Sequence, residues 1–397
     1  MRTELLSPVG NWPMLSAAIQ AKANAVYFGV KQLNMRMTAN NFELSELKKV
    51  VDYCHKHKVK AYLTLNTIIY DSELTKLKTI LAEAKKAKID AVIAWDFAVL
   101  EEAKKSKIPM HLSTQASISN SLSAKFIKKL GIKRIVLARE LSLEQIKHIK
   151  IKNPDLEIEC FIHGAMCVSI SGRCFLSQHI FKKSANRGEC LQPCRRKYII
   201  KDAEEGHELE LGNNYVLSPK DLCALPFIDR IKKAGVTCFK IEGRNKTPKY
   251  VKTVTECYRQ AIDKKLTKTQ INNLIKKLKT VYNKKFSSGF YLGLPTSDDF
   301  TNIYGSASKT KKQYIGIIKN FYNKVKVAEI KIESGSLKIG DKIMIQGNKT
   351  GCFEQKIKSM EIKNKRIHEA KKSQKVGIKL NKPARINDKL FLIYSTE

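Results

Sequence analysis

A short apolar run followed by an amphipathic segment recurs along the chain as far as Arg244. Apolar runs of this length are typical of buried strands, and the segments between them place apolar residues at the i, i+3 and i+4 positions of a helix face. Strands are predicted at 4–7, 25–28, 60–65, 91–95, 110–113, 134–138, 157–161 and 238–242. Helices are predicted at 12–22, 43–57, 72–86, 121–130 and 142–150.

Strands that alternate with helices in this way favour a parallel sheet. Eight strands with helical crossovers predict an α/β fold of the (β/α)8-barrel type. A doubly wound open sheet fits the same alternation, but no G-x-G-x-x-G follows the first strand, so a dinucleotide fold has no specific support.

Polar side chains directly follow most of the predicted strands. In a (β/α)8 barrel the loops after the strands carry the active site, so these side chains are candidates for substrate binding or catalysis. One of them, His163, could be a general acid or base, or a ring that only packs. The charged members could equally close the rim as ion pairs. The candidates are Asn34, Arg36, Asn66, Asp96, Gln115, Arg139, Glu140, His163, Glu242 and Arg244.

Four of the ten cysteines, Cys167, Cys174, Cys190 and Cys194, lie within 28 residues that follow the seventh predicted strand. Several thiolates on one loop are typical of a metal or iron–sulfur site. Zinc favours closely spaced pairs, and only the last two are that close, so an iron–sulfur cluster is preferred and zinc is the alternative. Buried thiols without a ligand role are the better interpretation of Cys54, Cys160, Cys238, Cys257 and Cys352.

The chain carries 74 Lys and Arg against 37 Asp and Glu. Such an excess attracts polyanions such as RNA, although lysines spread over solvated helix faces would give the same count. No apolar run is long enough to span a bilayer and no signal peptide is evident, so a cytoplasmic protein with no membrane partner is expected. Cysteines in that compartment indicate metal or redox chemistry rather than disulfides.

The stretch E-C-F-I-H-G-A-M-C at 159–167, followed by S-G-R-C-F-L-S at 171–177, resembles the signature of the U32 family of collagenase-like peptidases. Similar stretches occur at 4–10, 27–29, 34–36, 218–223 and 239–244, so the resemblance covers roughly residues 1–300. The better-understood members are hydroxylation proteins. They act on the wobble uridine of tRNA, on a cytidine of large-subunit rRNA, or in ubiquinone synthesis.

This resemblance implies a [4Fe–4S] cluster and, for the RNA-modifying members, prephenate as a small carboxylate ligand. It carries over Cys167, Cys174 and Cys190 as cluster ligands. Cys223, in the motif K-D-L-C, is slightly preferred as the fourth ligand, with Cys194 as the alternative. Together with the polar residues after the strands, the matched motifs give His163, Glu159, Gln115 and Asn66 as catalytic candidates. The substrate-binding candidates are Asn34, Arg36, Arg139, Arg173, Arg195, Lys240, Glu242 and Arg244.

The last part of the chain has a different pattern. Beyond a polar linker at 297–312, short alternating runs separated by turn residues predict strands. Residues 313–397 resemble domain 2 of elongation factor Tu, which implies a small β-barrel after a first domain at 1–300. Such a barrel could contact RNA or only pack on the first domain.

Three functions therefore stay open. The first is iron–sulfur-dependent hydroxylation of tRNA or rRNA, in which Trp95 or Tyr198 could support a base taken out of its stack. The second is the peptidase that the family name implies, although the chain has no H-E-x-x-H or G-x-S-x-G motif. The third is an iron–sulfur scaffold in a hydroxylase complex. The sequence leaves the oligomeric state open.

Overall fold

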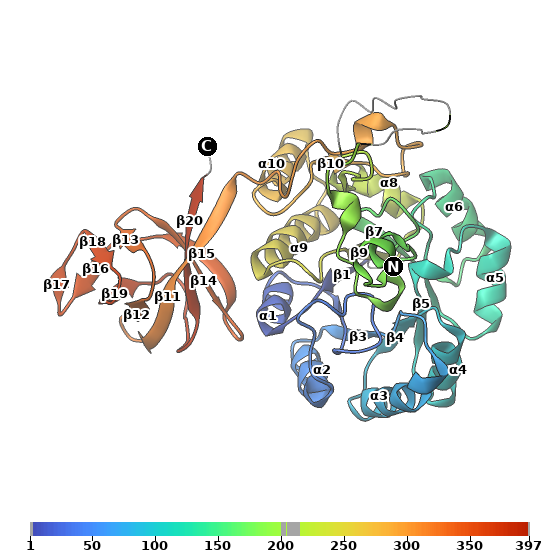
Figure 1. Cartoon of the computed structure of the whole chain (residues 1–397), viewed down its shortest axis with the longest axis horizontal. Helices are drawn as coiled ribbons and strands as arrows, with labels where there is room; N and C mark the ends of the chain where they lie inside the picture. The colour runs from blue at the N-terminus through green and yellow to red at the C-terminus, as the bar shows by residue number, and fades with distance from the viewer. Residues whose placement is uncertain (1–2, 200–203, 205–214, 396–397) are drawn as a thin grey trace.

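The structure is a computed structural model that describes residues 3–199, 204 and 215–395. Its larger part is a closed barrel of eight parallel strands inside a ring of helices (Figure 1). The chain runs once around the ring, and β9 closes it by pairing with both β1 and β7. The barrel strands are β1 (Glu4–Pro8), β2 (Ala25–Phe28), β3 (Lys60–Thr64), β4 (Ala91–Ala94), β5 (Met110–Leu112), β6 (Arg134–Val136), β7 (Glu157–Gly164) and β9 (Cys238–Ile241). The predicted barrel is confirmed, and the open sheet is excluded.

The helices pack their apolar faces on the barrel. In α2, for example, Leu47, Val50 and Cys54 are buried while the lysines between them face solvent. All five predicted helices form, and α4, α8, α9 and α10 add to them. The helices around the barrel are α1 (Trp12–Gln20), α2 (Leu47–Lys56), α3 (Leu74–Lys86), α4 (Phe97–Lys105), α5 (Ser121–Lys129), α6 (Leu143–Lys152), α8 (Ile228–Lys233), α9 (Pro248–Asp263) and α10 (Lys268–Leu278).

Two short strands extend the sheet beyond the barrel. β8 (Asp221–Cys223) runs antiparallel to the end of β7, with His163 opposite Cys223 and Gly164 opposite Leu222. β10 (Phe286–Ser287) then pairs with β8. The segment between β7 and β8, which carries the clustered cysteines and the short helix α7 (Leu176–Phe181), therefore leaves the barrel rim and returns to it. We call residues 165–199 the cysteine loop.

The C-terminal part is an antiparallel β domain with its own core, which includes Ile318, Ile330 and Leu390. It packs beside α1 and α9 (Figure 1), where Lys249 forms an ion pair with Glu354. Its first strand begins at Thr310, inside the segment predicted as a linker. The strands are β11 (Thr310–Tyr322), β12 (Val327–Ile332), β13 (Ser336–Lys338), β14 (Lys342–Gly347), β15 (Gly351–Lys356), β16 (Met360–Ile362), β17 (Lys365–Arg366), β18 (Glu369–Lys371), β19 (Lys375–Lys379) and β20 (Lys389–Ser395).

Within residues 3–199, 204 and 215–395, none of the helices is long and apolar enough to cross a bilayer.

Candidate active site

A pocket of about 140 Å³ opens where the barrel strands end, and we call it the mouth pocket. The loops after the strands and the cysteine loop line it together. Most of the polar residues predicted from the strand ends or from the matched motifs meet here. The predicted residues in its lining are Arg36, Asn66, Gln115, Arg139, Arg195, Lys240, Glu242 and Arg244, together with Cys167, Cys190 and Cys194.

The mouth pocket is strongly basic. Its only carboxylates among the described residues are Asp221 and Glu242. Low-dielectric walls strengthen the field of the surplus cations, so the pocket favours an anionic ligand. The seven basic side chains of the lining are Arg36, Arg139, Arg195, Lys240, Arg244, Lys246 and Lys284.

Arg139 is the least satisfied of these cations. Its Nη1 donates to the carbonyl oxygen of Ala165 over 2.9 Å, but the buried Nε and Nη2 have no hydrogen-bond partner. The guanidinium stacks 4.7 Å from the centroid of the Phe161 ring, which fixes its plane. Burial lowers the pKa of Arg139 from its usual value. A buried donor without a partner costs free energy, so these N–H groups are available to an acceptor on a ligand.

Glu242 is surrounded by cations at the end of β9. Arg36 Nη2 lies 3.4 Å from its Oε1. Burial alone would raise the pKa of Glu242, but Arg36, Lys246 and Arg139 hold it below its usual value. The carboxylate is therefore ionised at neutral pH, and it offsets only part of the positive charge.

Arg244 lies deeper, where its Nη1 donates to Thr64 Oγ1 over 2.8 Å. Burial lowers the pKa of Arg244 to about 10 and also lowers that of Lys246. Arg244 still carries its charge at neutral pH and adds to the positive potential of the pocket.

Asn66 and Gln115 form a polar wall at the ends of β3 and β5. The carbonyl oxygen of Asn66 accepts from Trp95 Nε1 over 3.0 Å, and its side-chain oxygen accepts from the backbone N–H of Met35 over 3.2 Å. Ser113 donates to the side-chain oxygen of Gln115. Amides held in this way can read hydrogen-bonding groups on a ligand, but they do not titrate.

The cysteine loop is fixed to the rim by close contacts. Gly188 has φ of +82°, and a Cβ atom there would lie 2.1 Å from the carbonyl oxygen of Asn34. Its own carbonyl accepts from Met37 N over 3.0 Å. One residue earlier, Arg187 forms an ion pair with Glu73. The loop is therefore held over the pocket as a structured cover.

Four thiols of this loop lie close enough to affect one another. Burial raises the pKa of Cys194 to about 11, and the charges of Cys167, Cys190 and Cys174 contribute to the rise. Cys223 is different: burial raises its pKa to about 11, but none of those three thiols contributes. Pairing of β8 with β7 buries Cys223, and its Sγ lies 3.8 Å from the Tyr258 hydroxyl. The structure therefore favours the alternative, Cys194, as fourth ligand, and the choice between the two stays a prediction.

Backbone N–H groups already point at two of these sulfurs. Leu176 N lies 3.4 Å from Cys174 Sγ, and Gln192 N lies 3.3 Å from Cys190 Sγ. Such donors stabilise thiolates and are typical of iron–sulfur ligands. In the described part of the chain, no group of three or more His, Cys, Asp and Glu side chains forms a ready-made site for a metal ion. The donor chemistry thus fits a thiolate-bound group, although the loop is not arranged around one.

His163 does not reach the mouth pocket. Its ring packs among Tyr250, Tyr258 and Phe286, and only 1% of the residue is exposed. The Nδ1 atom lies 3.3 Å from the Tyr258 hydroxyl. Burial lowers the pKa of His163 to about 3, so the ring is neutral at physiological pH. The structure therefore favours the packing interpretation over the predicted acid–base role.

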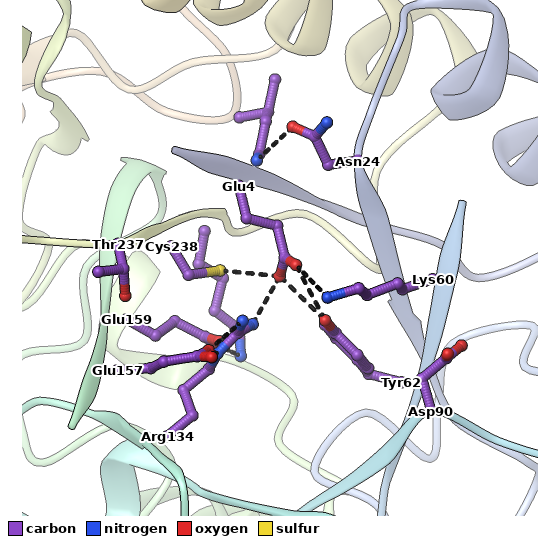
Figure 2. Close-up of polar contacts among 12 residues, drawn as sticks. Glu4, Asn24, Lys60, Tyr62, Asp90, Arg134, Glu157, Glu159, Thr237 and Cys238 are labelled. Atoms are coloured by element: carbon purple, nitrogen blue, oxygen red, sulfur yellow. Dashed lines mark hydrogen bonds and ion pairs between the residues drawn. The ribbon is translucent and has the colours of Figure 1, made fainter. Parts of the chain in front are cut away.

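Glu159 also lies below the pocket, inside the barrel. Its Oε1 accepts from Lys240 Nζ over 2.6 Å, and Arg134 Nη1 lies 3.6 Å from its Oε2. Figure 2 shows the network to which it belongs, with Glu4 at the centre and Arg134, Tyr62, Lys60 and Cys238 around it. The predicted catalytic role of Glu159 is not supported, because the carboxylate positions Lys240 from below instead of facing a ligand.

Two predicted substrate-binding residues and one further polar candidate from the strand ends lie elsewhere. Asn34 is fully buried and donates to the carbonyl oxygen of Val30, so it shapes the loop after β2. Arg173 lies in a neighbouring groove, over the ring of Trp95. Asp96 caps α4 by accepting from Ala98 N over 2.9 Å.

Sequence reasoning missed several members of the pocket. Lys246 follows Arg244 by two residues, so extending the search further into the loop would have found it. Asp221 and Lys284 belong to β8 and to the approach to β10, which no periodicity predicts. Tyr27 points inward from β2, where Lys240 Nζ lies 4.6 Å from its ring centroid.

The fold and the site together place the chain in the class of (β/α)8-barrel proteins that carry a cysteine-bearing loop over a basic pocket. Residues 10–300 match the model of Peptidase family U32, and the chain belongs to that family. It is 45% identical to an uncharacterized protease of Methanocaldococcus jannaschii, over 99% of this chain and 98% of the relative. It is 40% identical to a collagenase of Porphyromonas gingivalis, over 98% and 97%. It is 32% identical to tRNA hydroxylation protein P1 of Bacillus subtilis, over 90% and 87%.

Proposed function

We propose that this chain is an iron–sulfur-dependent RNA hydroxylation enzyme that acts on a pyrimidine of tRNA or rRNA. The observation that carries the proposal is the mouth pocket, in which surplus buried cations lie beneath a loop of four thiols. The tRNA hydroxylation relative matches along most of both chains, which supports the same chemistry here. The relatives named as proteases are more similar in sequence, so the experiment below must separate the two activities.

The basic side chains are suited to hold anions beside the reacting base. Arg139 offers two buried N–H groups without a partner, which matches a carboxylate or phosphate that accepts two hydrogen bonds. Lys240, held from below by Glu159, presents a second fixed cation. We assign this pair to the small carboxylate ligand, for which prephenate is the candidate.

The polar wall is suited to the base. Asn66 and Gln115 present amide groups at fixed positions, and a base that has left its stack is recognised by such groups. Hydroxylation replaces a ring hydrogen with a hydroxyl group and takes one oxygen atom from a donor. The protein's part is to hold base and donor in one small, partly water-excluding pocket.

Cys167, Cys174, Cys190 and Cys194 would hold the [4Fe–4S] cluster. When bound, the cluster would supply electron transfer at the edge of the pocket. The N–H groups of Leu176 and Gln192 would stabilise the ligand sulfurs. Arg36, which lines the mouth pocket together with Cys167 and Cys190, would offset negative charge on the cluster.

The test is anaerobic purification of the full chain, with iron and sulfide analysis and mass spectrometry of nucleosides from treated tRNA and rRNA. Wild type is expected to hold about four irons, as a cubane requires, and to form a hydroxylated pyrimidine. Cys194→Ala should lose both. Cys223→Ala is the control, since its buried thiol lies outside the group, and it should keep the iron.

Other outcomes would contradict the proposal. Zinc in place of iron would remove the cluster chemistry. Gelatin cleavage that survives Cys194→Ala, without any modified nucleoside, would establish the peptidase. If the protein holds iron but hydroxylation appears only when a partner enzyme is added, the protein is a scaffold.

A further inference from the structure

A second hollow lies beside the mouth pocket, between α4 and α5, with a volume of about 670 Å³. We call it the side groove. Several of its apolar side chains are unusually exposed: Phe97 by 75%, Leu122 by 76% and Phe126 by 58%. Exposed apolar side chains gathered at one hollow mark a binding surface rather than ordinary surface scatter. In Figure 1, α4 and α5 are neighbours in the helix ring.

The side groove combines aromatic faces with positive charge. Lys125, Lys129 and Arg173 line it, and none of its lining residues is Asp or Glu. The Arg173 guanidinium lies 5.1 Å from the centroid of the Trp95 ring, so the two planar groups form a shared surface. Aromatic platforms flanked by cations are the usual way in which proteins bind single-stranded nucleic acid.

The side groove and the mouth pocket share a wall. Gln115 lines both. Its backbone carbonyl accepts from Arg173 Nη1 over 3.2 Å, and Trp95 Nε1 donates to the carbonyl of Asn66, another mouth residue. A nucleic-acid strand with one nucleotide in the mouth pocket can therefore place the next nucleotide in the side groove.

We propose that the side groove binds a nucleotide that flanks the target base, by stacking of the flanking base on Phe97, Phe126 and Trp95 and by contact of its phosphates with Lys125, Lys129 and Arg173. The proposal rests on the function proposed above. It adds that the enzyme prefers an unpaired neighbour of the target, because a base in a duplex would have to break its base pair before it could stack here.

The test measures binding to the full-length holoprotein by fluorescence anisotropy, with uridine monophosphate as competitor and a labelled uridine pentanucleotide as probe. Phe97→Ala with Phe126→Ala should weaken pentanucleotide binding about 5- to 150-fold, the range for one base–aromatic stack. Monophosphate binding should not change. Ile151→Ala with Leu294→Ala is the matched control, since both side chains are exposed apolar groups outside the groove. Phe97→Tyr with Phe126→Tyr should keep the affinity.

Charge is tested separately. Lys125→Ala with Lys129→Ala should reduce the slope of log K against log salt by about one to two. If the phenylalanine pair binds the pentanucleotide as wild type does, while wild type hydroxylates RNA, the groove proposal alone fails. If wild type neither binds the pentanucleotide nor forms the hydroxylated nucleoside, the proposed function fails as well. Dimeric wild type with a monomeric phenylalanine variant would assign the groove to a second copy of the chain and overturn the proposal.

Discussion

The two ends of the barrel interior bury charge in opposite ways. At the start of the strands, Glu4 and Glu159 meet Arg134 and Lys240, and nearly every charge has a partner (Figure 2). At the end of the strands, basic groups outnumber carboxylates in the mouth pocket. Both regions are built from the same eight strands.

The difference separates structure from function. A buried charge that is paired contributes to a specific fold, whereas a buried cation without a partner costs stability and is retained where a ligand completes it. Lys240 belongs to both regions, since it pairs with Glu159 and also lines the mouth pocket. Glu159, at the paired end, thus orients the ammonium group of Lys240 at the mouth pocket.

The largest effect is expected from breaking the paired end. Arg134→Met removes the partner of Glu4 and Glu159 in the core and should destabilise the barrel by about 3–5 kcal/mol, because buried carboxylates lose their counter-charge. The shift of the urea unfolding midpoint measures it. Adding Glu4→Gln should recover part of the loss, and an unchanged midpoint in Arg134→Met would refute the pairing.

The corresponding change at the unpaired end should behave differently. Arg139→Met removes a cation with two unpartnered N–H groups, so stability should stay within about 1 kcal/mol of wild type. Binding of prephenate, measured by calorimetry, should weaken about 10- to 150-fold through loss of charge-assisted hydrogen bonds. If Arg139→Met lowered the free energy of unfolding as much as it weakened prephenate binding, the contrast between the two ends would be contradicted.

His163 allows a test by pH, because its ring is buried in the neutral form. Its pKa is about 3 in the folded state and 6.5 in the unfolded reference, so the unfolded chain binds the proton first as pH falls. Stability from this group is therefore present above pH 6.5 and is lost progressively toward pH 3. Between pH 7 and 5 the loss should be about 2 kcal/mol. His163→Phe should remove that part of the pH dependence of the thermal midpoint and leave RNA modification intact.

The smallest effect is expected at the edge of the paired end. Lys60 also approaches Glu4, with Nζ 3.4 Å from Oε2, but its side chain is 58% exposed. Lys60→Ala should cost only about 0.2–1 kcal/mol, since solvent screens the pair. A loss as large as that of Arg134→Met, measured by the same urea midpoint, would show that burial does not govern these interactions.

The fold followed from the sequence because each barrel strand is a compact apolar run bounded by polar segments. β8 escaped prediction because it forms by backbone pairing with the end of β7, which an apolar pattern does not indicate. Without β8, nothing along the chain indicates that Cys223 turns into the core. Periodicity reports which residues are buried, but not which strands pair.

The candidate site was predicted in part for a related reason. The position after a strand correctly predicted that Asn66 and Arg139 line the mouth pocket. The same rule also selected Asn34, whose side chain donates to the carbonyl oxygen of Val30 in its own loop and does not line the pocket. His163 follows the strand predicted at 157–161, but it lies within β7 and packs against α9, where Tyr250 and Tyr258 surround it. The direction of a side chain depends on neighbours from distant segments, and one sequence does not report them.

The antiparallel pairing of β7 with β8 has a consequence for how such a protein can change over time. Gly164 and Leu222 lie opposite one another, so the long excursion between them begins and ends at adjacent points of one sheet. Extending a loop with fixed ends costs little chain entropy, so insertions and replacements there leave the barrel intact. The segment between β7 and β8 can therefore change in sequence while the barrel keeps its structure. Its thiols can be replaced by other functional groups without any change in the eight strands beneath.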